Sequence, residues 1–524
     1  MTPVSTERLL APATTPTITS AVIVTAPAPQ PARRRVGVSP GVLVIACVFL
    51  GLAFRVGVYL RNPSLWLDES MLAVNVVNRT PLQLLEPLEL NQGAPLGFLL
   101  TSRAIVAAFG PSELALRAIP AFASLAGFLL FVGFAYRVLS VPAARLAVVL
   151  FAFSPYLVGY AAEFKQYELD ATLTVALLLI GRRIWEGTST RHEHVLMAIG
   201  GAVAVWFSHP AVFVLGGVGS ALLADAIVRR DRPAMKRNGL IIFAWLVSFA
   251  ACYLLFLRKL GLNPYLTDFW AGKFLPLPPV RPGDFAWIVH HVVLLFDKPG
   301  GFGGEIGMAG LAAVCAIIGG VSLAKSNWRL LVALAAPLAF ALAASALRKY
   351  PFAGRLMLFA VPSLLVLVAH GTMAVADRVR DLGTFARWLV IAAVCAGPAN
   401  ECNNLRKTPL HAEGAREVLV ELAKQWQPGD RVYVAHEAIP AFRYYGVPVP
   451  ADVVTFGGDN RANLRHYRED LHAISETGRL WVVMAHFQPQ DEATVLAVLD
   501  CLGAGEVTAR RPDAVLMRCE VRPR

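Results

Sequence analysis

Two adjacent carboxylates, Asp68 and Glu69, follow the first long apolar segment of the chain. The residues after them, from Met71 to Val77, are apolar enough to lie against a membrane. Charged side chains at this depth are costly and usually mark a functional site. The same pair also suits the start of a helix, which it would stabilise by about 1 kcal/mol through capping and the macrodipole. These residues alone leave both interpretations open.

A second cluster combines acids, a base and phenols within eleven residues. Its members are Tyr160, Glu163, Lys165, Tyr167, Glu168 and Asp170. Either these side chains share a functional site, or they form a solvated loop with compensating charges.

A third cluster is strongly cationic and joins two apolar segments. Its members are Arg348, Lys349, Tyr350 and Arg355. The charge pattern of the other loops places it on the outer side of a membrane, where cations are disfavoured. Binding of an anionic lipid headgroup or phosphate would explain three cations there, and snorkelling of long side chains is the alternative. Lys273, in the loop over residues 258–305, is a weaker candidate.

The composition places these clusters on a membrane protein. Hydrophobic residues make up 56% of the 524 residues and charged residues 16%, with a mean hydropathy of +0.55, which excludes a soluble globular protein. Residues 1–400 hold 33 Lys/Arg and 19 Asp/Glu, whereas residues 401–524 hold 15 and 17. The basic charge therefore belongs to the membrane part, and no nucleic-acid partner is expected.

The apolar segments predict an α-helical polytopic membrane protein with about 11 transmembrane helices. The expected helices cover residues 37–60, 113–136, 145–162, 169–185, 195–209, 210–228, 239–257, 306–324, 329–347, 355–376 and 386–399. Basic loops fall six times on the side of Arg33 to Arg35, which predicts a cytoplasmic N-terminus. Residues 1–36, rich in Ala, Pro and Thr, predict a disordered cytoplasmic tail. The membrane part is then residues 37–399, and the odd number of helices puts residues 400–524 outside.

Three long pieces are expected on the outer face: residues 61–112, residues 258–305 and the C-terminal part from residue 400. Within the first piece, Pro95 to Phe109 is apolar but only about 15 residues long and contains Arg103, which predicts an interfacial helix. The candidate residues should therefore be positioned by these outer pieces at the membrane boundary.

The C-terminal part, residues 400–524, predicts a small extracytoplasmic α/β domain with a mainly parallel sheet. Helices are expected at residues 413–425, 464–476 and 491–501, and buried strands at 431–435 and 480–485. No catalytic constellation is visible in it.

In an oxidising space Cys501 and Cys519 could form a disulfide, or the thiols could stay free. The chain has no CxxC pair and its outer loops have no DxD, so no metal or other cofactor is expected to be required, although a divalent cation remains an option.

Taken in order, these features resemble the GT-C fold glycosyltransferases that use polyprenyl-phosphate sugar donors. That family includes the protein O-mannosyltransferases, the aminoarabinose transferase of lipid A and the rhizobial galacturonosyltransferases. The resemblance covers about residues 45–370 and is carried by Trp66–Glu69, Gly93–Leu96, Phe109–Glu113 with Leu116 and Arg117, Tyr160–Glu163 with Tyr167, and Tyr350–Phe352 with Gly354 and Arg355. The HPPLGK-like stretch of the protein O-mannosyltransferases is replaced by Asn91 to Gly97, which argues against protein mannosylation of that strict type.

The resemblance implies an inverting transfer of a sugar from polyprenyl phosphate to an acceptor hydroxyl. It implies Asp68 as the general base, Glu69 either as its support or as the group that orients the acceptor, and either Glu163 or Asp170 as a second acid. Desolvation of the base could raise its pKa toward the working pH. Cations would hold the departing phosphate, and the candidates are Lys165, Arg348, Lys349 and Arg355. The substrate would contact Tyr167, Tyr350 and Lys273.

The expected partners are a polyprenyl-phosphate sugar, a lipid, glycan or protein acceptor, and membrane lipids. The expected location is the bacterial inner membrane, with the reaction on its extracytoplasmic face.

Two other membrane functions would also place cations near a lipid phosphate. A transporter or flippase of lipid-linked sugars predicts charges in the middle of spans and inverted repeats, which the sequence scarcely offers. An O-antigen polymerase or ligase would depend on arginine-rich outer loops more than on an acidic pair. A non-enzymatic receptor built around the C-terminal domain would tolerate Asp68→Asn.

Overall fold

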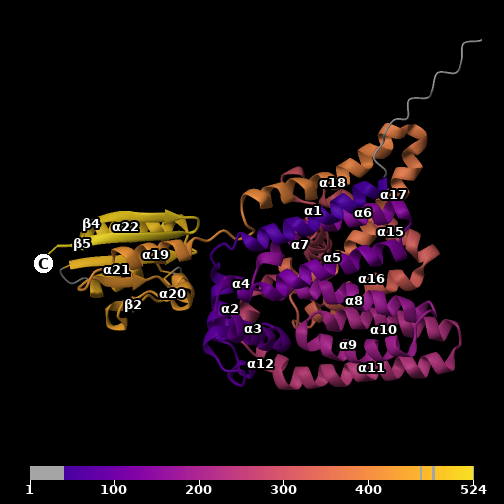
Figure 1. Ribbon diagram of the computed structural model, residues 1–524, viewed down its shortest axis with the longest axis horizontal. Coiled ribbons are helices and arrows are strands. Elements are labelled where there is room, and N and C mark those ends of the chain that lie inside the picture. The colour runs from indigo at the N-terminus through magenta and orange to yellow at the C-terminus, as the bar shows by residue number, and fades with distance from the viewer. Residues whose placement is uncertain (1–39, 461–462, 475–477, 523–524) are drawn as a thin grey trace, which may run out of the picture.

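The structure is a computed structural model that describes residues 40–460, 463–474 and 478–522. It consists of a helical part and a smaller domain with a β-sheet, which lies at one end of the helical part (Figure 1). The disordered tail expected over residues 1–36 lies outside the described residues, together with Arg33 to Arg35.

The helical part runs from α1 to α18, and each of the expected membrane segments contains helix. The helices are α1 (Pro40–Leu60), α2 (Leu67–Asn78), α3 (Leu96–Phe109), α4 (Glu113–Leu116), α5 (Ala118–Val138), α6 (Val141–Ala152), α7 (Pro155–Gly159), α8 (Tyr167–Trp185), α9 (Arg191–Phe207), α10 (Ala211–Val228), α11 (Arg232–Cys252), α12 (Arg258–Leu260), α13 (Pro264–Phe269), α14 (Pro282–Asp297), α15 (Ala309–Ser326), α16 (Trp328–Ala346), α17 (Val361–Arg378) and α18 (Thr384–Lys407). Two 3-10 turns, η3 (Tyr160–Ala162) and η7 (Gly354–Ala360), flank the site.

Several of these helices are suited to cross a membrane. Within the described residues, seven are long and apolar enough, and eight if the bent pair formed by α6 and α7 with η3 is one span. That pair breaks before Pro155, whose ring and missing N–H do not allow the preceding helix to continue. The segment expected to be interfacial forms α3, a short apolar helix. The protein is therefore a mostly helical, multi-pass membrane protein.

Close packing of α15 against α17 fixes the centre of the helical part. A Cβ atom on Gly371 would overlap the carbonyl oxygen of Cys315, and one on Gly319 would overlap the carbonyl oxygen of Leu367. Only glycine allows the two backbones to approach this closely, as is common between membrane helices. Because η7 leads directly into α17, this packing also fixes the position of Arg355.

Among the residues of the C-terminal domain that the structure describes, five strands and four α-helices are present. They are α19 (Ala415–Gln425), β1 (Arg431–Val434), α20 (Ile439–Tyr445), β2 (Val454–Phe456), α21 (Arg465–Ile474), β3 (Gly478–Ala485), α22 (Pro489–Leu502), β4 (Gly503–Arg511) and β5 (Ala514–Val521). The sheet has the strand order β2-β1-β3-β5-β4. The helices and two strands expected from the sequence are all present within a few residues.

The expectation of a mainly parallel sheet was wrong, because the sheet is mixed. β1 pairs in parallel with β2 and β3, but β5 pairs antiparallel with both β3 and β4. The edge strand β4 is mostly exposed and polar, so it lacks the continuous apolar run of a buried strand.

All seven cysteines are free, so Cys501 and Cys519 are not bridged.

The C-terminal domain is anchored on the connection between α1 and α5. The backbone N–H of Leu65 donates to the Tyr445 hydroxyl at 2.7 Å, and Arg416 Nη1 lies 2.6 Å from Glu113 Oε1. These contacts bring the domain beside Asp68, at the start of α2.

Candidate active site

A cavity of about 1300 Å³ lies between the helical part and the C-terminal domain. Its polar and charged lining comes from segments far apart in the sequence. These residues include Asp68, Gln92, Lys165, Tyr167, Arg348, Lys349, Tyr350, Arg355, His411, His436, Glu437, Asp459 and His486. Apolar side chains from the loop over residues 258–274 complete the wall. A large, mostly apolar cavity with a few convergent polar groups is typical of a ligand site.

Asp68 and Arg355 form an ion pair in this cavity. The residue that caps α2 is Trp66, so the Asp68 carboxylate is not used as a helix cap. The Arg355 guanidinium carbon lies 5.4 Å from the ring centre of Trp66 and 6.0 Å from that of Tyr167. The electron-rich ring faces hold the cation beside the carboxylate.

Lys165 is the second cation near Asp68. It is buried, and its Nζ donates a hydrogen bond to Gln92 Oε1 at 2.9 Å. Burial lowers the pKa of the Lys165 ammonium, although the nearby Asp68 carboxylate acts in the opposite direction. An ammonium held in a cavity with an incomplete set of partners is well suited to receive an anion.

The pKa of Asp68 corrects the expectation that desolvation would raise it. Burial does act to raise the pKa, but the positive charges of Lys165 and Arg355 outweigh it and leave the pKa below its ordinary value. The free site therefore holds an ionised carboxylate that is a weaker base than an exposed aspartate.

Glu69, in contrast to its neighbour, does not line this cavity. Its carboxylate oxygens accept hydrogen bonds from Arg117 Nε at 2.8 Å, from Arg117 Nη2 at 2.6 Å and from the backbone N–H of Phe164 at 2.5 Å. Both side chains of the pair are only 1% exposed. This buried pair ties the start of α2 to α5 and to the loop that carries Lys165.

Glu163 reaches the cavity only through His411. The Glu163 carboxylate pairs with Nδ1 of His411, whose ring stacks on Trp66 with 4.0 Å between ring centres. Burial acts to lower the pKa of His411, but the Glu163 carboxylate outweighs it and raises the pKa. His411 lines both the large cavity and a small one beside it, whereas Glu163 lines the small one.

Most of the remaining predicted residues line the cavity, but Lys273 does not. Arg348, Lys349 and Tyr350 line the cavity, and the Tyr350 hydroxyl donates to the carbonyl of Leu356 at 2.6 Å. Lys273 does not line the cavity, and its backbone carbonyl accepts a hydrogen bond from the N–H of Phe352 at 2.9 Å.

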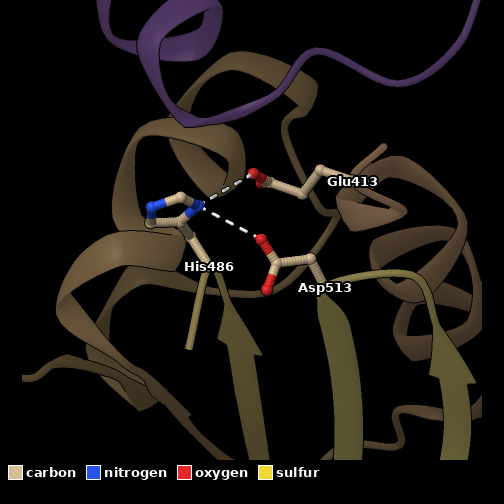
Figure 2. A group of neighbouring side chains, drawn as sticks. All are labelled: Glu413, His486 and Asp513. Carbon is tan, nitrogen blue, oxygen red and sulfur yellow. Dashed lines mark hydrogen bonds and ion pairs between the residues drawn. The ribbon is translucent and has the colours of Figure 1, made fainter. Parts of the chain in front are cut away.

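The C-terminal domain contributes residues to the site that were not predicted from the sequence. His411, between α18 and α19, belongs to no motif, and only the tertiary fold brings it to Trp66 and Glu163. The sequence likewise gives no signal for Glu413, His486 and Asp513, which meet beyond the C-terminal end of β3 (Figure 2).

The sequence matches no protein-family model and no curated protein. The fold matches ArnT from Cupriavidus metallidurans, an aminoarabinose transferase of the GT-C fold. The apo structure of ArnT aligns with a TM-score of 0.53 at 13% identity, covering 92% of this chain and 99% of that chain. ArnT bound to undecaprenyl phosphate aligns with a TM-score of 0.51 at 13% identity, covering 93% and 100%. The protein therefore has the fold of the GT-C membrane glycosyltransferases, in agreement with the resemblance seen in its sequence.

Proposed function

We propose that the protein is an integral membrane glycosyltransferase that moves a sugar from a polyprenyl-phosphate donor to an acceptor hydroxyl with inversion. One observation carries the proposal: Asp68, Arg355 and Lys165 lie together in a cavity large enough for both substrates. A carboxylate beside two cations provides a base and an anion site within one reaction centre. The similar fold of ArnT, which has been seen with undecaprenyl phosphate, supports the lipid phosphate as donor.

In the reaction that we propose, Asp68 takes the proton of the acceptor hydroxyl. The acceptor oxygen forms a bond to the anomeric carbon from the face opposite the phosphate, and the bond between that carbon and the phosphate oxygen breaks. The electron pair stays on polyprenyl phosphate, which leaves without a general acid because its second pKa is about 6. Arg355 and Lys165 stabilise the charge that grows on the departing phosphate.

Donor binding then changes the strength of the base. In the free protein Arg355 is paired with Asp68, and its charge keeps the Asp68 pKa low. A donor phosphate that takes over Arg355 and Lys165 neutralises part of that positive charge. The Asp68 pKa rises in consequence, so the carboxylate becomes a competent base only when the donor is in place.

The other predicted residues have supporting roles in this proposal. Glu69 positions the start of α2 through Arg117, and Glu163 acts on the cavity through His411. Arg348 and Lys349 extend the cationic side of the cavity, and Tyr167 and Tyr350 contact the substrate there. Lys273 contributes backbone rather than side chain.

The lipid chain of the donor would follow the apolar wall of the cavity. Leu262, Tyr265 and Phe269, in and before α13, line the cavity and are 71%, 56% and 62% exposed. Exposed apolar side chains at a membrane boundary suit an isoprenoid chain better than water. The acceptor, a lipid, glycan or protein, would enter from the side of the C-terminal domain, and we infer that this side is extracytoplasmic in a bacterial inner membrane.

The experiment that tests this function measures release of polyprenyl phosphate from a panel of polyprenyl-phosphate sugars by purified protein. Wild type is compared with Asp68→Asn, with and without a crude membrane-lipid acceptor. We expect turnover with one donor in wild type and a loss of about 10²- to 10⁴-fold in Asp68→Asn, the usual size of a general-base contribution. The donor should bind the variant at least as tightly, because Arg355 no longer pairs with a carboxylate.

Asp377→Asn provides the matched control. Asp377, at the end of α17, is 63% exposed and pairs with Arg387 rather than lining the cavity, so its turnover should equal wild type. Equal turnover by Asp68→Asn and wild type would refute Asp68 as the base. Donor binding that never leads to release would instead favour a transporter of lipid-linked sugars.

A further inference from the structure

Three potential metal ligands from separate segments meet at one end of the strands of the C-terminal sheet. Glu413 precedes α19, His486 follows β3, and Asp513 lies in the turn between β4 and β5. Figure 2 shows the two carboxylates directed toward the imidazole of His486. One ligand atom from each residue can be chosen so that all three lie within 4.8 Å of one another.

The distances between these atoms suit a tetrahedral cation. His486 Nδ1 lies 3.1 Å from Asp513 Oδ2 and 3.9 Å from Glu413 Oε2. Zinc bonds of about 2.0–2.2 Å in tetrahedral geometry hold neighbouring ligand atoms about 3.3–3.6 Å apart. These two separations bracket that value, and all three ligand atoms lie within 4.8 Å of one another, so small side-chain movements would bring them onto one cation.

Glu413 supplies an independent sign that a cation is needed. Its side chain is only 2% exposed, and its Oε1 atom is buried without a hydrogen-bond partner. A buried carboxyl oxygen with no partner is costly unless an unseen group satisfies it.

The ligand types select the kind of ion. An imidazole nitrogen with two carboxylate oxygens suits zinc, whereas calcium and magnesium prefer ligand sets made of oxygen alone. We propose that Glu413, His486 and Asp513 bind a zinc-class divalent cation that fixes the C-terminal domain on the start of α2.

The link to α2 is direct. Glu413 Oε2 accepts a hydrogen bond from the backbone N–H of Leu67 at 3.0 Å, and Leu67 immediately precedes Asp68. A cation that holds the Glu413 carboxylate therefore also holds the backbone beside Asp68. The site is a positioning device of the C-terminal domain, and its occupancy does not depend on the reaction proposed for the cavity.

The test uses the full chain in detergent, freed of any polyhistidine tag and stripped of metal with EDTA. Zn²⁺ binding is measured by competition with a chromophoric chelator. We expect one ion per chain, and a loss of at least about 100-fold in affinity for His486→Ala and for Glu413→Gln, because even outer partners of a metal site contribute 10- to 100-fold. His486→Cys, which offers a thiolate in place of the imidazole, should retain binding.

His466→Ala is the matched control, since His466 is an exposed histidine of the same domain and pairs with Asn463. Its zinc affinity should equal wild type. A second readout is amide hydrogen exchange at Leu67, which zinc should slow in wild type and leave unchanged in Glu413→Gln. Absence of zinc binding by wild type at micromolar concentrations, or equal binding by wild type and His486→Ala, would overturn the proposal.

Discussion

Arg355 of η7 and Asp68 of α2 form an ion pair inside the cavity, between two segments that lie far apart in the sequence. The pair links the anion site to the proposed base, because the charge that would bind a phosphate also lowers the pKa of the carboxylate. In the reaction that we propose, binding of the donor and activation of the base would therefore be coupled.

Removal of Arg355 should shift the acidic limb of the pH profile. In Arg355→Gln one cation no longer lowers the Asp68 pKa, so the pKa rises and protonation inactivates the base at a higher pH. The pH dependence of kcat/KM, which reports the free protein, should therefore have its acidic limb at higher pH in the variant. Arg387→Gln, which removes an arginine paired with Asp377 on α17 and α18, should keep the wild-type limb. An unchanged limb in Arg355→Gln would argue that another group titrates.

Loss of Arg117 should destabilise the protein strongly. Arg117→Ala leaves the Glu69 carboxylate buried and unpaired, which costs about 3–5 kcal/mol of unfolding free energy. Thermal unfolding in detergent should show a clearly lower midpoint. Lys259→Ala breaks an ion pair with Glu86 whose side chains are 43% and 64% exposed, so it should change stability by less than about 1 kcal/mol. Similar midpoints for the two variants would contradict the positioning role of Glu69.

The contact of α15 with α17 should not tolerate a side chain at Gly371. Gly371→Ala forces its Cβ into the carbonyl of Cys315, and such overpacking typically costs about 1–3 kcal/mol. Gly310→Ala in α15 is the control, because no atom lies within 4 Å of its added Cβ. There the helix propensity of alanine should stabilise the protein by up to about 1 kcal/mol. The two unfolding midpoints, measured together, should move in opposite directions.

Labelling of Cys501 can show on which side of the membrane the C-terminal domain lies. Its thiol is exposed on α22, whereas the other six cysteines are buried or partly buried. A membrane-impermeant maleimide should label wild type in intact cells with an open outer membrane, and Cys501→Ser should lose most of that label. Labelling that requires lysis of the inner membrane would place the domain in the cytoplasm.

The sequence by itself determined the helical membrane architecture and the residues most suited to chemistry. Hydropathy and loop charge are local properties, so the helices and the position of Asp68 just after the first of them could be expected from neighbouring residues. The cationic cluster around Arg355 could be recognised in the same way, because charged side chains at a membrane boundary are costly and usually functional.

Only the tertiary structure decided which of these residues act together. Asp68 and Glu69 are adjacent in the chain, yet one lines the cavity and the other is buried against Arg117. His411 joins the site although no motif contains it. Such roles depend on contacts between distant segments, which periodicity and composition do not encode. The edge strand β4 escaped prediction because it buries too little to show a hydrophobic pattern. The neighbouring strand β5 is buried and begins with an apolar run, and it was also not predicted.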